Sequence, residues 1–261
     1  MDKNKYILTI AGHDPSGGAG LTSDIKTFEA HGLYGLSVCT AMTVQNDLDF
    51  KQCIWTEVDV IMAQIDILFE RFEIHVVKIG IVESWKTLDL ILNKLHQLNI
   101  DIKIVLDPII RASAGFDFHE TENQDLLDNI WKQCFIMTPN YDEIQRLYPK
   151  LTIARTIEHI SKATNVYLKG GHRSHKKGWD TLYHNGIVMV NIPPNTDKVY
   201  EKHGSGCVLS ASLASNFALQ IALEDAAKNA KQYTEQFLNS DKGLLGKHKQ
   251  NTDTRHLIPN P

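Results

Sequence analysis

The segment Lys202–Ser210 places two glycines, a serine and a cysteine at the start of an apolar stretch with helical character. Backbone N–H groups in the first turn of a helix have no partner within the helix and lie at the positive end of its dipole. The amides of Gly204, Ser205 and Gly206 are therefore suited to bind a phosphoryl group during its transfer. Cys207 falls in the first turn, where a thiol pKa is lowered and a thiolate could accept a proton. A plain helix start with a small buried cysteine would leave the same pattern.

A second glycine-rich turn follows the apolar run 8–11. Gly17, Gly18 and Gly20 allow the backbone to approach a ligand closely or to adopt positive φ. The turn is neither a dinucleotide-binding fingerprint nor a P-loop, because the spacing G-x-G-x-x-G and the residues G-K-[ST] are missing. Alone, it indicates only the strand-to-helix junction of an α/β protein.

The chain has 261 residues and a formal charge of −4. This length is enough for one large α/β domain with a sizeable core. We expect a single domain over residues 1–261, with a polar tail that frays from about residue 239. Proteins that bind nucleic acid carry clustered basic residues, so we expect no such partner. The basic stretch 172–177 is interpreted as a solvated loop or a phosphate contact. Because no long apolar run and no signal peptide are found, we expect no membrane span and a cytoplasmic location.

The four cysteines form no C-x-x-C pair and no zinc set with histidines. We expect Cys39, Cys53 and Cys134 to be small buried apolar residues. Only Cys207 has a local setting that indicates reactivity.

Apolar, β-branched runs alternate with amphipathic stretches along most of the chain. This alternation predicts an α/β fold with a mainly parallel sheet and helices on both faces. Strands are predicted at 6–11, 37–43, 75–79, 102–106, 135–138 and 165–169. Helices are predicted at 20–31, 57–72, 85–97, 125–132, 141–147, 156–163, 205–221 and 223–238.

The dipeptide Asn185-Gly186 separates two further strand-like runs, 181–184 and 187–190. Asn-Gly between strands is a strong hairpin signal, so we expect an antiparallel hairpin at one edge of the sheet. The polar segment 193–203 is expected to be a mobile loop that closes over phosphates, or else an ordinary connection.

Ligands of open parallel sheets bind beyond the carboxyl ends of the strands. Several polar or small residues fall at or just past these predicted ends, namely Gly12, Gln45, Lys78, Asp107, Asn140 and Lys169. The sequence therefore predicts a ligand site at this edge.

The residues 11–20, with Asp24 after them, resemble the signature of the hydroxymethylpyrimidine/phosphomethylpyrimidine kinases, members of the ribokinase-like superfamily. The resemblance covers roughly residues 5–222. It implies a ribokinase-like three-layer α/β/α fold. Further blocks that resemble the family follow in the expected order, namely 32–38, 43–46, 78–80, 106–108, 138–140 with Glu143, 169–172 and 203–207.

The resemblance implies an enzyme of thiamine biosynthesis. It would phosphorylate 4-amino-5-hydroxymethyl-2-methylpyrimidine, and then phosphorylate that monophosphate to the diphosphate. ATP and Mg²⁺ are the implied cofactors, the small aminopyrimidine is the implied partner, and a homodimer is the implied assembly. Two alternatives stay open: a pyridoxal or pyridoxine kinase, whose substrate is also a ring with a hydroxymethyl arm, and a non-catalytic pyrimidine-binding sensor.

The resemblance implies that Gly12, Asp24, Gln45 and Ile81 bind the substrate. The Gln45 amide carries a donor and an acceptor, which suit the ring nitrogen and amino group of an aminopyrimidine. A strand-end glutamine facing water is the alternative. Asp24 would bind or orient the hydroxymethyl group, or it would be an exposed first-turn acid favoured by the helix dipole.

The N-x-x-E motif of Asn140 and Glu143 organises Mg²⁺ in ribokinase-like enzymes, often through water. Magnesium keeps several waters and needs few protein ligands, although the same two residues could simply form a capping box. Asp107 is a second acidic candidate near the metal. Lys169, with Gly171, should reach the nucleotide phosphate, and such placed charges suffice for phosphoryl transfer.

Sugar kinases of the superfamily often have Asp where this chain has Cys207, whereas the pyrimidine kinases have Cys. A neutral hydroxymethyl group loses a proton as it attacks, but a phosphate is already anionic, so a base at Cys207 should serve the first transfer only. The chain departs from the family pattern at Ser205 and Val208, where Thr is usual, at His13, where Ser or Thr is usual, and at Ile81, where Met is usual.

Overall fold

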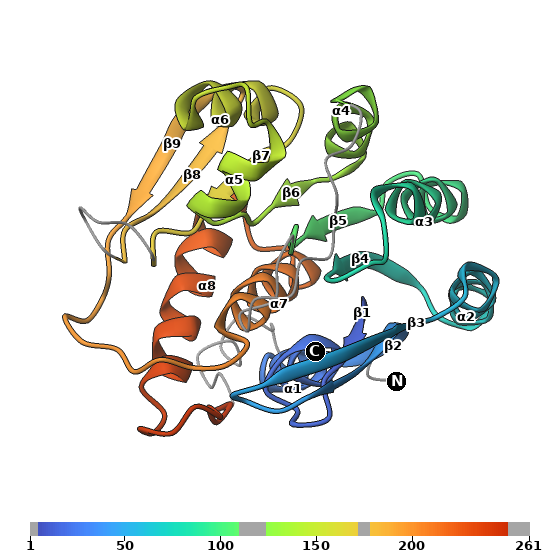
Figure 1. Ribbon diagram of the computed structural model, residues 1–261, viewed down its shortest axis with the longest axis horizontal. Helices are drawn as coiled ribbons and strands as arrows, with labels where there is room; N and C mark the ends of the chain where they lie inside the picture. The colour runs from blue at the N-terminus through green and yellow to red at the C-terminus, as the bar shows by residue number, and fades with distance from the viewer. Residues whose placement is uncertain (1–4, 110–123, 172–177, 250–261) are drawn as a thin grey trace, which may run out of the picture.

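The computed structural model describes residues 5–109, 124–171 and 178–249. Their strands form one sheet with the order β3-β2-β1-β4-β5-β6-β7-β8-β9 (Figure 1). The strands are β1 (Tyr6–His13), β2 (Tyr34–Gln45), β3 (Phe50–Trp55), β4 (Ile74–Ile79), β5 (Lys103–Leu106), β6 (Ile136–Met137), β7 (Asn165–Leu168), β8 (Asp180–His184) and β9 (Ile187–Ile192). The helices are α1 (Gly20–Ala30), α2 (Val58–Arg71), α3 (Trp85–Leu98), α4 (Gln124–Gln133), α5 (Tyr141–Leu147), α6 (Ile153–Ser161), α7 (Ser205–Ala218) and α8 (Leu223–Leu238).

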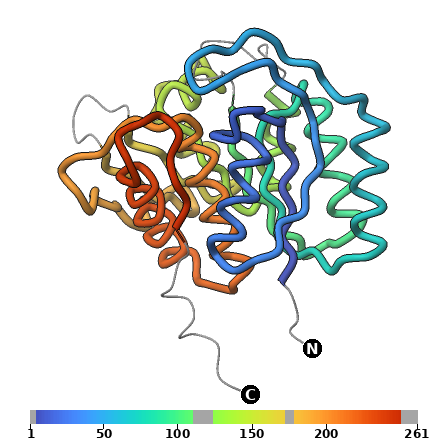
Figure 2. Tube along the Cα trace, turned by 90° about the horizontal axis from the view of Figure 1, so that it is seen from below, coloured from blue at the N-terminus to red at the C-terminus, as the bar shows by residue number. Residues whose placement is uncertain are grey.

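The centre of the sheet is parallel, from β2 through β1, β4, β5 and β6 to β7. Successive side chains of β1 point to opposite faces, so Leu8 and Ile10 join one apolar core and Ile7 joins the other. The first core is completed by residues of α2 to α6, and the second by residues of α1, α7 and α8. Figure 2 shows α1, α7 and α8 next to one another on one side of the sheet. The three-layer α/β/α prediction is therefore confirmed.

Both edges of the sheet are antiparallel hairpins. The predicted one is β8–β9, where Asn185 and Gly186 have φ of 50° and 81°, as a two-residue hairpin turn requires. The other, β2–β3, was not predicted. Its turn has no Asn-Gly signal, and is held by the Asn46 side chain, which accepts hydrogen bonds from Leu48 N and Asp49 N. Strand β3 also lies outside the core, with mostly exposed or half-buried side chains.

The prediction of a fraying tail from about residue 239 is wrong for residues 239–249. This segment folds back on α8: Tyr233 Oη lies 3.1 Å from His248 Nδ1, and Lys247 N donates to Ser240 Oγ. Residues 250–261 lie outside the described part.

Two of the three cysteines expected to be buried, Cys39 and Cys53, are only partly buried. Within the described residues, no helix is long and apolar enough to cross a membrane.

His31 ends α1 in the core between α1, α7 and α8, with 3% of its surface exposed. Its Nδ1 lies 2.9 Å from Thr27 O, and its Nε2 lies 3.0 Å from Ser212 Oγ. A carbonyl only accepts, so Nδ1 carries the proton and Nε2 accepts from the serine. The ring also meets Tyr233 edge to face. Burial lowers the pKa of His31 to about 4.

This buried histidine should make stability depend on pH. An unfolded chain binds a proton at His31 below about pH 6.5, whereas the folded chain does not until about pH 4. The free energy of unfolding should therefore fall as pH falls through this window, by up to about 3 kcal/mol from this group. We expect His31→Asn to flatten that slope in urea unfolding between pH 6.5 and 4.5. His75→Asn, at an exposed histidine, is the matched control, and a His31→Asn slope equal to wild type would contradict the assignment.

Candidate active site

The start of α7 has the geometry that the sequence predicts for an anion hole. Gly204 is the N-cap, with a left-handed φ of 75°, and the first α-helical bond runs from Val208 N to Gly204 O. The N–H groups of Ser205, Gly206 and Cys207 therefore have no acceptor within the helix. A Cβ on residue 204 would overlap Gly18 O, so the close approach of the two glycine-rich turns requires glycine at this position.

Cys207 lies where two helices begin. It is 7% exposed, and the backbone N–H of Gly20, the first residue of α1, lowers the pKa of its thiol. Burial raises the pKa of the Cys207 thiol to about 11; Lys78 lowers it, while Asp24 and Asp107 raise it further. The expected thiolate is therefore wrong for the unliganded protein. Cys207 does lie in the first turn of α7, as predicted, but burial and the two carboxylates raise its pKa more than the helix start lowers it.

A chain of charges runs along the start of α7 on the predicted nucleotide side. Lys169 Nζ lies 2.9 Å from Asp107 Oδ1 and 3.7 Å from Glu143 Oε2. Asp107 also accepts a hydrogen bond from Thr138. A Cβ placed on Gly206 would lie 3.6 Å from Lys169 Nζ and 3.7 Å from Asp107 Oδ2. The structure thus brings the predicted lysine and acid together beside the anion hole.

The N-x-x-E motif is a complete capping box. Asn140 Oδ1 accepts from Glu143 N at 2.8 Å, and Glu143 Oε2 accepts from Asn140 N at 2.7 Å. Burial raises the pKa of Glu143 to about 7, which Lys169 only partly offsets. Within the described residues, no group of three or more His, Cys, Asp or Glu side chains could hold a metal. Two carboxylates nevertheless fit Mg²⁺, since this ion prefers oxygen ligands and retains waters.

The Lys169–Gly171 turn is held by Asp180 and Lys231, two residues that the sequence patterns did not single out. Gly170 N donates to Asp180 Oδ1 at 2.6 Å, and Lys231 Nζ of α8 lies 3.0 Å from Asp180 Oδ2. Gly171 itself is exposed, with open space around its Cα. The basic stretch 172–177 lies outside the described residues.

On the predicted substrate side, Gly12 and Ile81 are in contact. A Cβ on Gly12 would overlap Ile81 Cδ1, and Thr40 Oγ1 holds the Ile81 carbonyl at 2.6 Å. Gln45 is the last residue of β2, half-buried, where β2 extends past β1 and pairs only with β3. The structure thus gives Gln45 neither a buried nor a fully solvated position.

Asp24 is not an exposed acid in the first turn of a helix, which was one of the two roles predicted for it. It is fully buried, accepts from Thr9 Oγ1 at 2.6 Å, and forms an ion pair with Lys78 Nζ at 2.8 Å, while its Oδ1 has no hydrogen-bond partner. Burial alone would lower the pKa of Lys78, but the nearby Asp24 carboxylate raises it, so the lysine keeps its charge. A lysine inside the apolar run 74–79 was the signal for this pair.

The 193–203 loop is tied to α8 and to the C-terminal segment. Asn195 N donates to Glu235 Oε2 at 2.9 Å, and the buried Lys202 donates to Asp241 O at 2.8 Å. Its predicted closure over phosphates stays a prediction.

Comparison with known proteins identifies the family of the chain. The family model described as phosphomethylpyrimidine kinase matches residues 14–253. A hydroxymethylpyrimidine/phosphomethylpyrimidine kinase of Rhizobium meliloti is 32% identical over 235 residues, with 87% of each chain covered. The enzyme of that name from Aquifex aeolicus is 33% identical over 251 residues, with 92% of this chain and 96% of the other covered.

Solved structures show the same fold. A crystal structure of phosphomethylpyrimidine kinase from Clostridium difficile has a TM-score of 0.72 and 32% identity, covering 88% of this chain and 97% of the other. The pyridoxal kinase of Staphylococcus aureus in complex with pyridoxal has a TM-score of 0.79 at 21% identity, covering 97% and 95%. That second likeness shows the fold alone. The matched family model and the relatives above 30% identity together show that the chain belongs to the phosphomethylpyrimidine kinase family.

Proposed function

We propose that this kinase transfers the γ-phosphoryl group of ATP first to the hydroxymethyl group of 4-amino-5-hydroxymethyl-2-methylpyrimidine, and then to the resulting monophosphate, in thiamine biosynthesis. The observation that carries the proposal is the anion hole at the start of α7, with Lys169 and Asp107 beside Gly206. The names of the relatives support the two substrates.

Each group has a distinct part in the proposed reaction. The Ser205, Gly206 and Cys207 amides face the transferring phosphoryl group and stabilise its charge. Lys169 binds nucleotide phosphate with the help of Asn140 and Gly171. Gly12 and Ile81 hold the pyrimidine ring, Gln45 binds its polar edge, and Asp24 orients the hydroxymethyl group through Lys78 and Cys207.

Magnesium is the implied metal, and Asp107 and Glu143 are the residues that would hold it. Bound there, it would neutralise phosphate charge. Lys169 forms ion pairs with both of these carboxylates. Cytoplasmic location stays a prediction.

A pyridoxal kinase is the nearest alternative, because three structures of the pyridoxal kinase of Staphylococcus aureus share the fold at 19–21% identity. The relatives named for the pyrimidine are more similar in sequence, at 32–33%. We expect kcat/KM with the aminopyrimidine to exceed that with pyridoxal in ATP-coupled assays. A higher value for pyridoxal would reverse the assignment, and an absence of ATP turnover with either compound would point to a non-catalytic sensor.

The homodimer also stays a proposal. The residues that best support it are Met42, Val44 and Ile54, which are exposed large apolar side chains on the β2–β3 hairpin. Met42 and Ile54 pair across the two strands. Such a patch is typical of an interface.

The Gln45 amide should form hydrogen bonds with the ring nitrogen and the amino group of the pyrimidine. Gln45→Leu would leave the ring nitrogen and amino group unpaired, which should cost about 1–3 kcal/mol in kcat/KM. Gln52→Leu, at an exposed glutamine of the adjacent strand β3, is the matched control. Unchanged kinetics for Gln45→Leu with the aminopyrimidine would remove Gln45 from the site.

Cys207 should accept the proton of the hydroxymethyl group in the first transfer. With a pKa of about 11, its thiolate fraction rises about tenfold per pH unit above pH 7, so kcat for the alcohol should rise while the transfer to the monophosphate stays nearly flat. Cys207→Ala should slow the alcohol reaction by about 10²–10⁴ and remove its pH dependence.

The control is Cys39→Ala, which replaces a half-buried thiol on β2 and should keep the wild-type profile. Rates are measured separately with the alcohol and with the monophosphate from pH 7 to pH 9. Equal losses for both substrates, with a flat wild-type profile, would assign Cys207 to the shape of the anion hole instead.

A further inference from the structure

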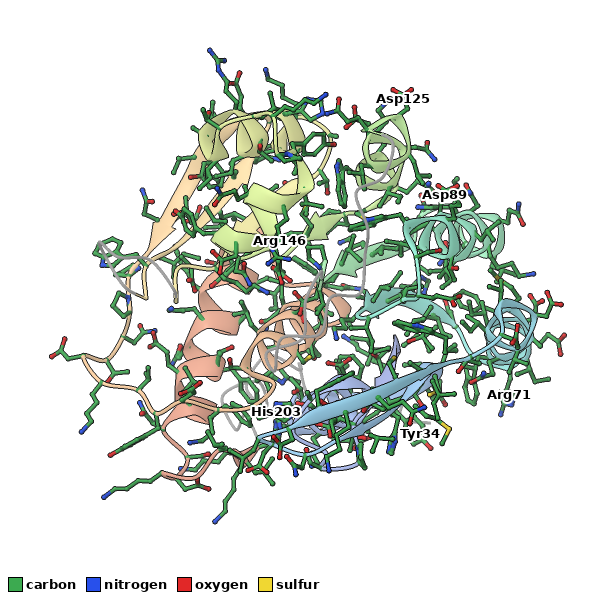
Figure 3. All side chains as sticks on the ribbon, viewed as in Figure 1. Tyr34, Arg71, Asp89, Asp125, Arg146 and His203 are labelled. Carbon is green, nitrogen blue, oxygen red and sulfur yellow. The ribbon has the colours of Figure 1, made fainter. Side chains whose placement is uncertain are left out.

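The two glycine-rich turns are joined by a side-chain pair that the proposed chemistry does not use. Asp14, in the first turn, is 1% exposed, and its Oδ2 lies 2.8 Å from Nε2 of His203, the residue before Gly204. A carboxylate only accepts, so His203 Nε2–H donates. His203, labelled in Figure 3, thereby reaches from the start of α7 to the turn before α1.

Asp14 also organises its own turn. Its carboxylate accepts from Ser16 N at 2.8 Å, from Ser16 Oγ at 2.9 Å and from Ala19 N at 2.8 Å. Burial alone would raise the pKa of Asp14, but the hydrogen bonds from His203, Ser16 and Ala19 lower it, so the group is ionised at neutral pH. One charge therefore fixes the turn that leads into α1 and the residue that leads into α7.

The backbone leaves no room between the turns. A Cβ on Gly18 would lie 2.7 Å from His203 Cδ2, and one on Gly204 would overlap Gly18 O. Because the turns touch, a shift of His203 also shifts the amides of Ser205, Gly206 and Cys207 relative to α1. Cys207, whose thiol pKa the backbone N–H of Gly20 lowers, lies at the same junction.

The C-terminal segment holds His203 from the other side. His203 N donates to Leu244 O at 3.0 Å, and the preceding Lys202 donates to Asp241 O at 2.8 Å. A Cβ on Gly18 would lie 2.8 Å from Leu245 Cδ2, so this segment also covers the first turn. His203 is thus fixed through its side chain by Asp14 and through its backbone by Leu244.

We propose that His203 is a positioning residue for phosphoryl transfer, which acts with Asp14 to hold the anion hole in register with the start of α1. The proposal rests on the proposed kinase function. An anion hole stabilises the transition state only when its donors sit where charge develops, and a misplacement of about 1 Å can cost about 100-fold in rate. The pair touches neither the pyrimidine nor the nucleotide contacts named above, so its loss should act on kcat rather than on KM.

The test compares three variants with wild type in both transfers. His203→Phe keeps the ring shape and removes the donor, Asp14→Asn removes the charge, and the double variant carries both changes. We expect each single variant to lower kcat by about 10- to 100-fold, equally for the alcohol and for the monophosphate, with KM for the pyrimidine changed less than threefold. Because the two residues act as one unit, the double variant should be no slower than the slower single variant.

His203→Gln is the conservative variant, since its amide can donate to Asp14, and it should recover most of the lost rate. His159→Phe changes a part-exposed histidine that also faces an aspartate, Asp128, at a distance from this junction, and should leave both rates unchanged. Thermal unfolding of every variant identifies loss of folding. Fully additive losses, an effect on one transfer only, or a KM effect without a kcat effect in folded variants would overturn the proposal.

A structural readout separates this proposal from the function itself. Hydrogen exchange should quicken in His203→Phe across residues 14–20 and 203–207 but not across β5 or α3. If wild type fails to phosphorylate the pyrimidine, the proposed function fails, and the exchange result still reports whether the pair holds the two turns together. Unchanged exchange at both turns, in an active enzyme, would contradict the positioning role.

Discussion

One buried lysine, one partly buried lysine and three buried carboxylates lie around the start of α7, and each depends on the others for its charge. Lys78 pairs with Asp24, and Lys169 lies between Asp107 and Glu143. Taking an ion out of water costs several kcal/mol, so none of these groups would stay ionised alone. Removal of one partner from such a pair is expected to cost about 3–5 kcal/mol, because the other charge is left uncompensated. The site is therefore also a structural centre of the fold.

The charges of this cluster do not balance. Two positive side chains, Lys78 and Lys169, face three carboxylates. The deficit is consistent with the raised pKa of Glu143, for which burial is the larger cause and Asp107 a further one. The same deficit acts with burial to keep Cys207 a thiol, since a thiolate would add a fourth negative charge. A site with more negative than positive side chains is suited to bind a cation with its nucleotide.

The sequence patterns predicted the fold more accurately than they predicted the electrostatics of the site. Parallel strands buried on both faces read as continuous apolar runs, so β4, β5 and β7 were found close to their observed bounds. Strand β3 was missed because it is half-exposed and follows a turn without glycine. The strand-end rule brought together Asp107, Asn140 and Lys169, which follow the neighbouring strands β5, β6 and β7. It could not show that Asp24 is buried beside Lys78, or that burial gives Cys207 a high pKa, since both depend on packing between distant segments.

Two different nucleophiles can use this one site because its parts come from separate elements. The pyrimidine contacts proposed here lie at the ends of β1, β2 and β4, whereas the phosphoryl contacts lie on α7 and after β7. The transferring group and its anion hole are the same in both reactions, and only the proton on the attacking group differs. In the proposed mechanism, the neutral alcohol needs an acceptor, and the buried thiol of Cys207 supplies one without adding permanent negative charge to the place where phosphates must bind. A carboxylate at position 207 would be a better acceptor at neutral pH, but it would repel the phosphate of the second substrate. Under the proposed mechanism, a thiol at this position therefore gives up speed in the first transfer so that the same pocket can admit an anionic substrate in the second.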